Sequence, residues 1–308
     1  MLEKSPQSPA PVLTIGGSDN SCGAGVQMDL KTITALGGHA MTVVTSLTSQ
    51  SHEKVFSVTE LPSEKIREQI QCSLLDFHPE AVKIGMLGNL DILKVVLQEL
   101  KRLKLPNVVL DPVLVSSSGK SLLSVSPDKS NRQPGKPKSN DKKDHNDFTQ
   151  SKVFSNFIDL FSLTTLITPN IPEAEAFTQT KIHSKKDIEK AATWFLDHGA
   201  QAVLVKGGHS NDKQLSEDYL LCHTNKLKLN KWISALREPT LTSPHGTGCL
   251  FSSAIATCLA KGLDVEKSIQ LSKKYITLAI RNSYFTNNKI PVLRPGLLNN
   301  IDQEIGKS

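Results

Sequence analysis

The chain has 308 residues, of which 38% are hydrophobic and 21% are charged, and this composition is typical of a globular protein with a sizeable core. Its formal net charge is +6, but the basic residues are scattered along the sequence, so nucleic acid is not expected as a partner. No run of 18 apolar residues occurs, which argues against a membrane-spanning helix.

The first part of the chain alternates between short β-branched runs and longer amphipathic runs. Residues 12–16 form a predicted strand, and residues 25–36 a predicted helix with Val26, Leu30 and Ile33 on one face. Two glycines at 37–38 are expected to end that helix. The same reasoning gives strands at 41–47, 81–84 and 108–111 and helices at 63–77, with Phe77 inward, and at 89–103, with Asn89 as N-cap.

The alternation continues in the second part of the chain. Strands are predicted at 163–168 and 202–206, and Ser184 with Asp187 begins the helix between them in a pattern close to a capping box. A hairpin at 219–233 and helices at 246–260 and 265–282 follow. Such an alternation predicts a mostly parallel sheet covered by helices on both faces, with ligands outside the carboxyl ends of the strands.

One segment interrupts this pattern. Residues 126–147 contain no aliphatic or aromatic side chain other than those of proline and histidine, so they cannot offset the entropy of ordering by burying apolar surface. We expect a disordered insertion at about 126–150, serving either a regulatory or partner-binding role or none. The expected organisation is one domain at 12–295, with a flexible tail at 1–11 and a second tail at 296–308.

The cysteines indicate the compartment. There are five, an odd number, and none is at the C-x-x-C spacing, so neither a disulfide framework nor a zinc site is expected. Reduced thiols are typical of intracellular proteins, and the N-terminus has no apolar signal segment. We expect a cytoplasmic protein and do not exclude the nucleus.

Five motifs follow predicted strands or begin predicted helices. Glycines in the segment 245–249, His-Gly-Thr-Gly-Cys, allow backbone N–H groups to converge on an anion at a helix start, where the thiol pKa of Cys249 should fall. The alternative is a plain glycine-rich turn before a core helix. The glycine-rich segment 16–25 follows the first predicted strand, but it lacks the G-x-x-x-x-G-K-[ST] pattern of a P-loop. Two further motifs are Asp111 and Lys206, each at the end of a predicted strand. The fifth is Asn170 with Glu173, and this pair either holds hydrated magnesium or simply caps a helix.

The order of these motifs resembles that of the hydroxymethylpyrimidine/phosphomethylpyrimidine kinases of the ribokinase-like superfamily. The match covers about residues 12–285 and includes Asp29-Leu30-Lys31-Thr32, Gln50, the segment 83–87 (Lys-Ile-Gly-Met-Leu) and Cys249 after Gly-Thr-Gly. The resemblance implies a three-layer α/β/α fold and stepwise ATP-dependent phosphorylation of the thiamin precursor hydroxymethylpyrimidine. It also implies Mg²⁺ as cofactor, a monovalent cation in addition, and a homodimer.

The resemblance assigns roles to individual residues. The pyrimidine would contact Asp29, Gln50, Thr48, Gly17 and Met86. The remaining roles are the anion hole at Gly246, Thr247 and Gly248, the base Cys249, the ATP-phosphate ligands Lys206, Asn170 and His245, and the magnesium ligands Glu173 and Asp111.

The sequence also departs from the family pattern around the substrate pocket. Asn20 and Cys22 replace proline and glycine, Ser51 and His52 follow the glutamine, and Pro244 precedes the histidine. Two alternatives to the pyrimidine kinase therefore stay open: a pyridoxal or pyridoxine kinase, and an inactive relative that binds a pyrimidine or a partner protein as a regulator.

Overall fold

The computed structural model describes residues 8–114, 152–207, 214–223, 228–237 and 244–296. The insertion predicted at 126–150 lies outside these residues, as do residues 1–7 and 297–308 of the two predicted tails, whereas residues 10 and 11 belong to the first strand. Within the described part of the chain, no helix is both long and apolar enough to cross a membrane.

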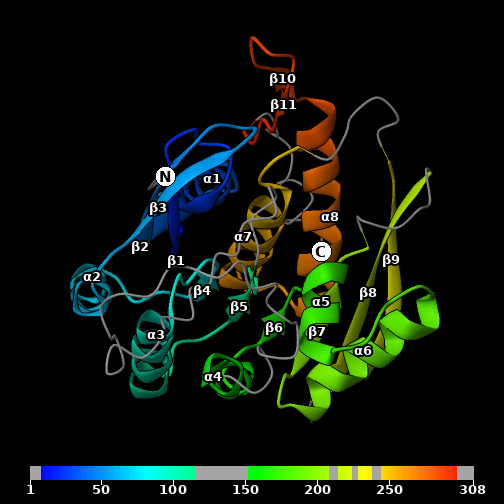
Figure 1. Cartoon of the computed structure of the whole chain (residues 1–308), viewed down its shortest axis with the longest axis horizontal. Helices are drawn as coiled ribbons and strands as arrows, with labels where there is room; N and C mark the ends of the chain where they lie inside the picture. Colours follow the sequence, from blue (N-terminus) through cyan, green and yellow to red (C-terminus); the bar gives the residue numbers. More distant parts are fainter. Residues whose placement is uncertain (1–7, 115–151, 208–213, 224–227, 238–243, 297–308) are drawn as a thin grey trace, which may run out of the picture.

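A nine-stranded sheet forms the centre of the described part of the chain (Figure 1), in the order β3-β2-β1-β4-β5-β6-β7-β8-β9. Neighbours from β2 to β7 are parallel, and β3, β8 and β9 are antiparallel additions at the edges. The strands are β1 (Ala10–Asp19), β2 (Gly38–Gln50), β3 (Val55–Glu60), β4 (Ala81–Ile84), β5 (Val108–Leu110), β6 (Leu166–Ile167), β7 (Ala202–Val205), β8 (Leu215–His223) and β9 (Lys228–Leu236).

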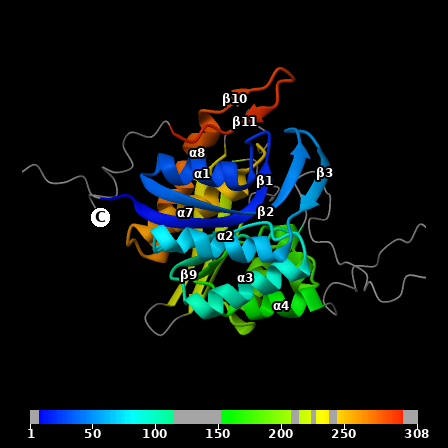
Figure 2. The same cartoon turned by 90° about the vertical axis from the view of Figure 1, so that its left-hand side faces the viewer.

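Helices cover both faces of this sheet (Figures 1 and 2), as the strand–helix alternation predicts. One face packs against α1 (Gly25–Ala35), α7 (Thr247–Ala260) and α8 (Val265–Arg281). The other face packs against α2 (Ser63–Asp76), α3 (Leu90–Leu103), α4 (Lys152–Phe161), α5 (Ile171–Thr178) and α6 (Lys185–Asp197). A small sheet of β10 (Tyr284–Phe285) and β11 (Pro291–Val292) follows α8. The expected three-layer α/β/α class is confirmed.

The strand order places the ligand end of the sheet at a defined point. The order reverses between β1 and β4, which pair in parallel although α1, β2, β3 and α2 separate them in the chain. In doubly wound folds a crevice opens at such a reversal, outside the carboxyl ends of the strands. The glycine-rich segment after β1 and the Met86 segment after β4 both lie at this point.

Several sequence predictions are corrected by the structure. Leu30 and Phe77 are 44% and 41% exposed, although both were expected to face the core. In α1 the buried position belongs to Asp29 instead, because ion pairing and hydrogen bonds satisfy its carboxylate. The first strand starts at Ala10, two residues earlier than predicted, and β3, α4 and the β10–β11 pair were not predicted.

Candidate functional site

Asp19 organises the glycine-rich loop that follows β1. Its carboxylate accepts hydrogen bonds from the backbone N–H groups of Ser21, Gly23 and Ala24 and from the Ser21 hydroxyl. The Nε2 atom of His245 lies 3.4 Å from Asp19 Oδ2. Burial opposes ionisation of Asp19, but the bonds from His245, Ser21 and Ala24 outweigh it and lower its pKa to about 2. The loop is therefore built around a permanently charged carboxylate.

The segment 245–249 packs directly against this loop. Gly246 is the N-cap of α7 with φ of 87°, a left-handed conformation that favours glycine. A Cβ atom at Gly246 would overlap the carbonyl group of Gly23, so the close approach of the two turns also requires glycine. Gly246, Thr247 and Gly248 thus stand at a helix N-terminus, where backbone N–H groups and the helix dipole favour an anion.

His245 lies beside the glycine-rich loop that follows β1. The resemblance assigns it to the ATP phosphates, but its imidazole contacts Asp19 and the Gly23 region of the glycine-rich loop. Its ring centroid is 6.4 Å from that of His52, and a Cβ atom at Gly23 would meet both rings. In this structure, His245 therefore joins the segment 245–249 to the glycine-rich loop that follows β1.

Cys249 occupies the first turn of α7, but its thiol is not acidic. Burial, reinforced by the carboxylates of Asp29 and Asp111, raises its pKa to about 11, against the opposing effect of the Lys83 ammonium. The expectation that a helix N-terminus lowers this pKa is wrong, because desolvation of the thiolate outweighs the helix dipole. Cys249 is a protonated thiol in the free protein at neutral pH.

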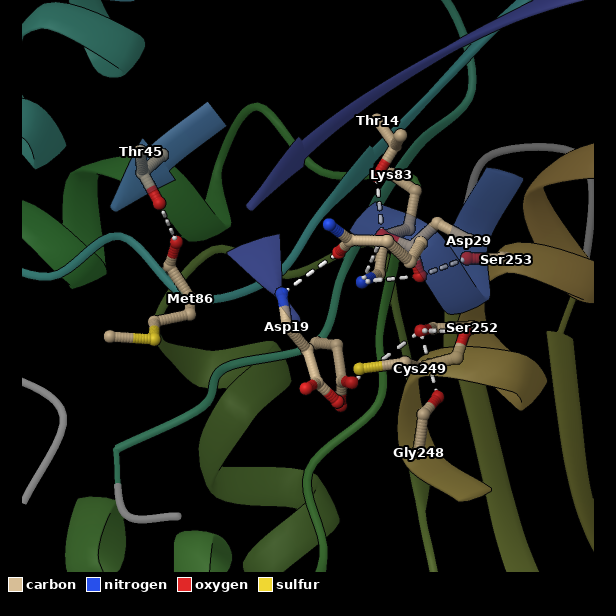
Figure 3. A network of polar contacts seen from close by, with 12 residues as sticks. Thr14, Asp19, Asp29, Thr45, Lys83, Met86, Gly248, Cys249, Ser252 and Ser253 are labelled. Carbon is tan, nitrogen blue, oxygen red and sulfur yellow. Dashed lines mark hydrogen bonds and ion pairs between the residues drawn. The ribbon is translucent and has the colours of Figure 1, made fainter. Parts of the chain in front are cut away.

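Asp29 anchors a buried polar network beside Cys249 (Figure 3). Its two oxygens accept hydrogen bonds from Thr14 Oγ1 at 2.6 Å, Ser253 Oγ at 2.7 Å, and Lys83 Nζ at 2.9 and 3.0 Å. Asp29 is fully buried and Lys83 is 1% exposed. Four protein hydrogen bonds hold the Asp29 carboxylate in place, and its role as a direct pyrimidine ligand stays a prediction of the resemblance.

Other residues assigned to the pyrimidine lie together on the β1, β2 and β4 edges. A Cβ atom placed on Gly17 would contact Met86 Sδ and Ser46 Oγ at 3.1 and 3.0 Å, so these three positions form one wall. The Thr48 hydroxyl donates to the Ser18 carbonyl at 2.8 Å. The backbone N–H of Gln50 donates to Asn20 Oδ1 at 2.7 Å, which holds the end of β2 to the glycine-rich loop.

A second set of charged side chains lies beside Gly248. Lys206 Nζ is 2.6 Å from Asp111 Oδ1, and a Cβ atom at Gly248 would lie 3.5 Å from Lys206 Nζ and 3.4 Å from Asp111 Oδ2. Burial and the neighbouring Asp111 charge raise the pKa of Glu173 to about 7, although Lys206 opposes this. The pKa of Lys206 is raised by both carboxylates against the effect of burial.

Asn170 and Glu173 form a complete capping box at the start of α5. Asn170 Oδ1 accepts from the Glu173 N–H, and Glu173 Oε2 accepts from the Asn170 N–H, both at 2.8 Å. The structural interpretation of this motif is therefore correct. The described residues contain no group of three His, Cys, Asp or Glu side chains arranged for a metal. Magnesium held mainly by nucleotide phosphates and water needs only one or two carboxylates, and Asp111 and Glu173 fit that requirement.

A cleft of about 550 Å³ lies between β9 and α8, and the sequence did not indicate it. Its lining includes Lys273, which donates to Asp218 Oδ2 at 2.6 Å. The other oxygen of Asp218 accepts from the backbone N–H of Gly207, the residue after Lys206. The cleft is thereby linked to the Lys206 region. Its other lining residues are Ile233, Ser234, Ala235, Gln270, Lys274, Thr277 and Leu278.

Comparison with known proteins identifies the family. The phosphomethylpyrimidine kinase family model matches residues 19–133 and 142–293. The hydroxymethylpyrimidine/phosphomethylpyrimidine kinase of Aquifex aeolicus is 35% identical over 273 residues, covering 88% of this chain and 94% of that protein. The chain belongs to the phosphomethylpyrimidine kinase family. The expectation of a ribokinase-like phosphotransferase is confirmed.

Solved structures agree with this family assignment. The phosphomethylpyrimidine kinase of Clostridium difficile has a TM-score of 0.68 at 35% identity, covering 88% of this chain and 99% of that one. The pyridoxal kinase of Staphylococcus aureus in complex with AMP-PCP and pyridoxal has a TM-score of 0.74 at 28% identity, covering 95% and 96%. The chain is thus similar over most of its length to a phosphomethylpyrimidine kinase and to a pyridoxal kinase.

Two departures from the phosphomethylpyrimidine kinase pattern have visible structural effects. Cys22 stands where the family usually has glycine and adopts φ of 57°, a conformation that costs energy in a residue with a Cβ atom. Asn20, in place of proline, supplies the side-chain acceptor for Gln50. Both substitutions change the conformation and contacts of the glycine-rich loop after β1, and neither changes the central sheet.

Lys83 is one of several site residues to which sequence reasoning gave no role, with Asp19, Thr14 and Ser253. The signal was present, since a lysine between apolar neighbours in a predicted buried strand needs a buried partner. What could not be read from the chain was the partner, because Asp29 lies 54 residues away and Ser253 is 224 residues from Asp29.

Proposed function

We propose that the protein phosphorylates 4-amino-5-hydroxymethyl-2-methylpyrimidine with ATP, first to the monophosphate and then to the diphosphate, in thiamin biosynthesis. The observation that carries this proposal is the contact between the two turns. The N-terminus of α7, with Gly246 at its cap, packs on the glycine-rich loop, which supports an anion hole beside the proposed substrate wall.

The aminopyrimidine is proposed to lie against Gly17 and Met86, with the Gln50 side chain on its polar edge. An amide carries both donors and an acceptor, which suits a ring that presents an amino group beside a ring nitrogen. Asn20 holds the Gln50 backbone and so orients that amide. The resemblance also gives Asp29 a contact with the ring, and Thr14, Lys83 and Ser253 hold its carboxylate in place.

Phosphoryl transfer requires mainly positioning and stabilisation of charge. A bond forms between the hydroxymethyl oxygen and the γ-phosphorus while the bond to the β,γ-bridging oxygen breaks. The N–H groups of the segment 246–248 bind the transferring phosphoryl oxygens. The thiol of Cys249 first releases its own proton to solvent, and the small thiolate population then accepts the hydroxyl proton and returns to the thiol.

Lys206 is proposed to exchange its Asp111 partner for a phosphate oxygen when the nucleotide binds, and Asp111 is thereby released toward the cation. Magnesium, when bound, neutralises charge on the phosphates, and Asp111 and Glu173 would hold it. Asn170 fixes the Glu173 carboxylate by its place in the capping box. A monovalent cation is a further expectation, tested by replacing potassium with a bulky organic cation.

The cleft between β9 and α8 is proposed to hold the remainder of the nucleotide. Its size is within the range of small-molecule sites, which span roughly 300–1,000 Å³. Lys273 and Lys274 bring positive charge to this cleft, and the Lys273–Asp218–Gly207 chain links it to Lys206. The nucleotide would then extend from α8 to the N-terminus of α7.

The test is a product assay on the purified protein with magnesium and ATP, in which hydroxymethylpyrimidine and pyridoxal are offered in parallel and products are identified by mass spectrometry. Mono- and diphosphate from the pyrimidine are expected, and the Gly246→Ala variant is the matched control for a contaminating kinase. Monophosphate as the final product would remove the second step from the proposal.

Pyridoxal kinase activity is the second candidate. The similarity to the Staphylococcus aureus pyridoxal kinase over 95% of this chain favours it. Turnover of pyridoxal alone would replace the main proposal, and no turnover of either alcohol by a folded sample would leave a regulatory relative. A homodimer and a cytoplasmic location are further predictions, tested by light scattering after gel filtration and by cell fractionation.

A further inference from the structure

The pairing of β1 with β2 is irregular at one point. The register of Cα partners shifts between Gly16 and Ser18, so that Gly17 alone lies opposite two residues of β2, Thr45 and Ser46. Two residues opposite one is the arrangement of a β-bulge, which bends a strand, re-aims its side chains and is common beside active sites. Because Gly17 belongs to the wall proposed for the pyrimidine, the bulge lies at that wall.

Both bulge residues of β2 contact Met86, which lies in the segment after β4. The Thr45 hydroxyl donates to the Met86 carbonyl oxygen at 2.7 Å (Figure 3). Ser46 Oγ lies 3.9 Å from Met86 Sδ. Consecutive side chains of a regular strand point to opposite faces of the sheet, and the bulge accounts for the approach of both residues to one partner. Thr45 and Ser46 are fully buried.

Hydrogen bonds to the backbone fix β2 around the Thr45 hydroxyl. The side chain of Gln69, in α2, binds both backbone groups of Val44: Oε1 accepts from the N–H at 2.9 Å, and Nε2 donates to the carbonyl at 3.1 Å. The Thr45 carbonyl accepts from the Leu61 N–H at 2.9 Å. The hydroxyl therefore lies on a part of the strand that has little freedom to move.

The segment that carries Met86 is also held on either side of this residue. The Gly85 N–H donates to a β1 carbonyl at 2.8 Å, and the Asn89 amide donates to the Glu60 carboxylate. The Thr45 hydroxyl binds the chain between these two points, at the Met86 carbonyl. Since valine has nearly the shape of threonine but no donor, this contact gives the hydroxyl group of residue 45 a role of its own.

We propose that Thr45 is a positioning residue for the ring pocket: its hydroxyl fixes the Met86 backbone so that the thioether lies against Gly17, and Ser46 supports the thioether. Thr45 itself is fully buried and does not touch the substrate. The proposal rests on the proposed function for the place of the pyrimidine against Met86. It deepens that function by naming the two residues that set the position of the wall.

The test observes Met86 directly, by NMR of the full-length protein labelled at the methionine methyl carbons. The chain has four methionines, so the spectrum is simple, and Met86→Leu assigns the Met86 signal. In Thr45→Val the Met86 signal is expected to move or to split. The signal of Met28, which is fully buried in another part of the core, should keep its position and so report an intact fold. An unmoved Met86 signal would overturn the proposal.

A second pair of variants separates the hydroxyl of Thr45 from its methyl group. Thr45→Ser and Thr45→Ala both lack the methyl group, and only the serine keeps a donor. The serine variant is expected to leave the Met86 signal near its wild-type position, and the alanine variant to move it. Equal shifts in both would overturn the proposal, because packing of the methyl group would then place Met86.

Thr164→Val is the matched control for loss of a buried hydroxyl. Thr164 is fully buried, and its hydroxyl donates to the Phe161 carbonyl at 2.7 Å in the turn after α4. This bond is of the same kind as the one between Thr45 and Met86, but it involves neither β2 nor the segment after β4. The Met86 signal is therefore expected to stay unchanged in Thr164→Val.

Kinetics and ligand titration connect the contact to the substrate. With hydroxymethylpyrimidine, Thr45→Val is expected to raise KM about twofold to tenfold, the effect of one ordinary hydrogen bond, and to leave kcat within about twofold. Thr45→Ser should restore KM. An unchanged KM in Thr45→Val would overturn the proposed role in the ring pocket. If the Met86 signal responds to the Thr45 variants but not to saturating hydroxymethylpyrimidine, the proposed function fails while the positioning of Met86 by Thr45 stands.

Discussion

The two glycines of the anion-hole turn meet different surroundings, and their substitution should differ accordingly. A Cβ atom at Gly246, where φ is 87°, would overlap the Gly23 carbonyl, whereas one at Gly248 would lie 3.4 Å from Asp111 Oδ2, an ordinary contact. Gly246→Ala is expected to lower kcat/KM by about 100-fold or more, as loss of an oxyanion-hole donor does. Gly248→Ala should lower kcat/KM by less than about tenfold. Both variants are compared with the wild type on samples that have equal circular dichroism. Equal losses would contradict the assignment.

Cys22 adopts a backbone conformation that is unfavourable for a residue with a side chain. Its φ of 57° lies in the left-handed region, where a residue with a Cβ atom pays about 1–2 kcal/mol. Glycine avoids that cost but loses more backbone entropy on folding. Cys22→Gly is therefore expected to raise the free energy of unfolding by about 0.5–1 kcal/mol, measured by urea denaturation. A lower urea midpoint would show that the Cys22 side chain makes contacts worth more than the strain.

At the scale of the element, Glu173 in the first turn of α5 should make the free energy of unfolding depend on pH. Glu173 has its pKa raised to about 7 by burial and the Asp111 charge, so the folded protein binds a proton that the unfolded chain has lost by that pH. Stability from this group is full below pH 4.5 and declines as pH rises to about 7. The decline is on the order of 3 kcal/mol.

Glu173→Gln removes this titration and keeps an acceptor for the capping box. Urea unfolding is expected to show equal stability of variant and wild type at pH 5 and a more stable variant at pH 8. Glu175→Gln on the same helix is the matched control, because the Ile182 N–H and Lys181 lower the pKa of Glu175 despite its partial burial. That variant should lose stability at pH 8, and a gain there would contradict the sign of the argument.

The elements that the sequence predicts well are those with both a periodic apolar face and a capping residue. Asn89 and Ser184 cap α3 and α6 as expected, each accepting from the backbone N–H three residues later. The strand β3 was missed because its residues are exposed or only partly buried, which weakens the alternation in its sequence. Leu30 was misplaced because periodicity counts apolar residues and cannot see that Asp29 is the one buried by its partners.

At the scale of the whole molecule, the site depends on contacts that no single sequence reveals. The parallel order of β2 to β7 is readable from the strand–helix alternation, and it brings the predicted motifs to one edge. Which side chains then meet is decided by packing: Asp19 with His245, Lys206 with Asp111, and Asp29 with Lys83 and Ser253. The resemblance names Asp29 and His245 as site residues, but it does not reveal that Asp29 meets Lys83 and Ser253 or that His245 meets Asp19.

The β8–β9 extension of the sheet is tied to the helical layer by one buried ion pair. Lys273 of α8 binds Asp218 of β8 at 2.6 Å, and both side chains are less than a tenth exposed. Lys273→Met leaves the Asp218 carboxylate buried without its cation, which should lower the free energy of unfolding by about 3–5 kcal/mol. Adding Asp218→Asn removes the unpaired charge and keeps the acceptor for Gly207, so the double variant should recover most of that loss.

Recovery of stability separates the structural role of the pair from a role in nucleotide binding. In the wild type, AMP-PCP with magnesium at a hundred times its Kd should stabilise the fold by about 2.7 kcal/mol. The double variant, refolded but lacking the Lys273 ammonium in the β9–α8 cleft, is expected to lose most of this stabilisation in the same urea titration. Full nucleotide stabilisation in the double variant would place the nucleotide away from that cleft, and a double variant as unstable as Lys273→Met would mean that the packing of the lysine chain, rather than its charge, joins the hairpin to α8.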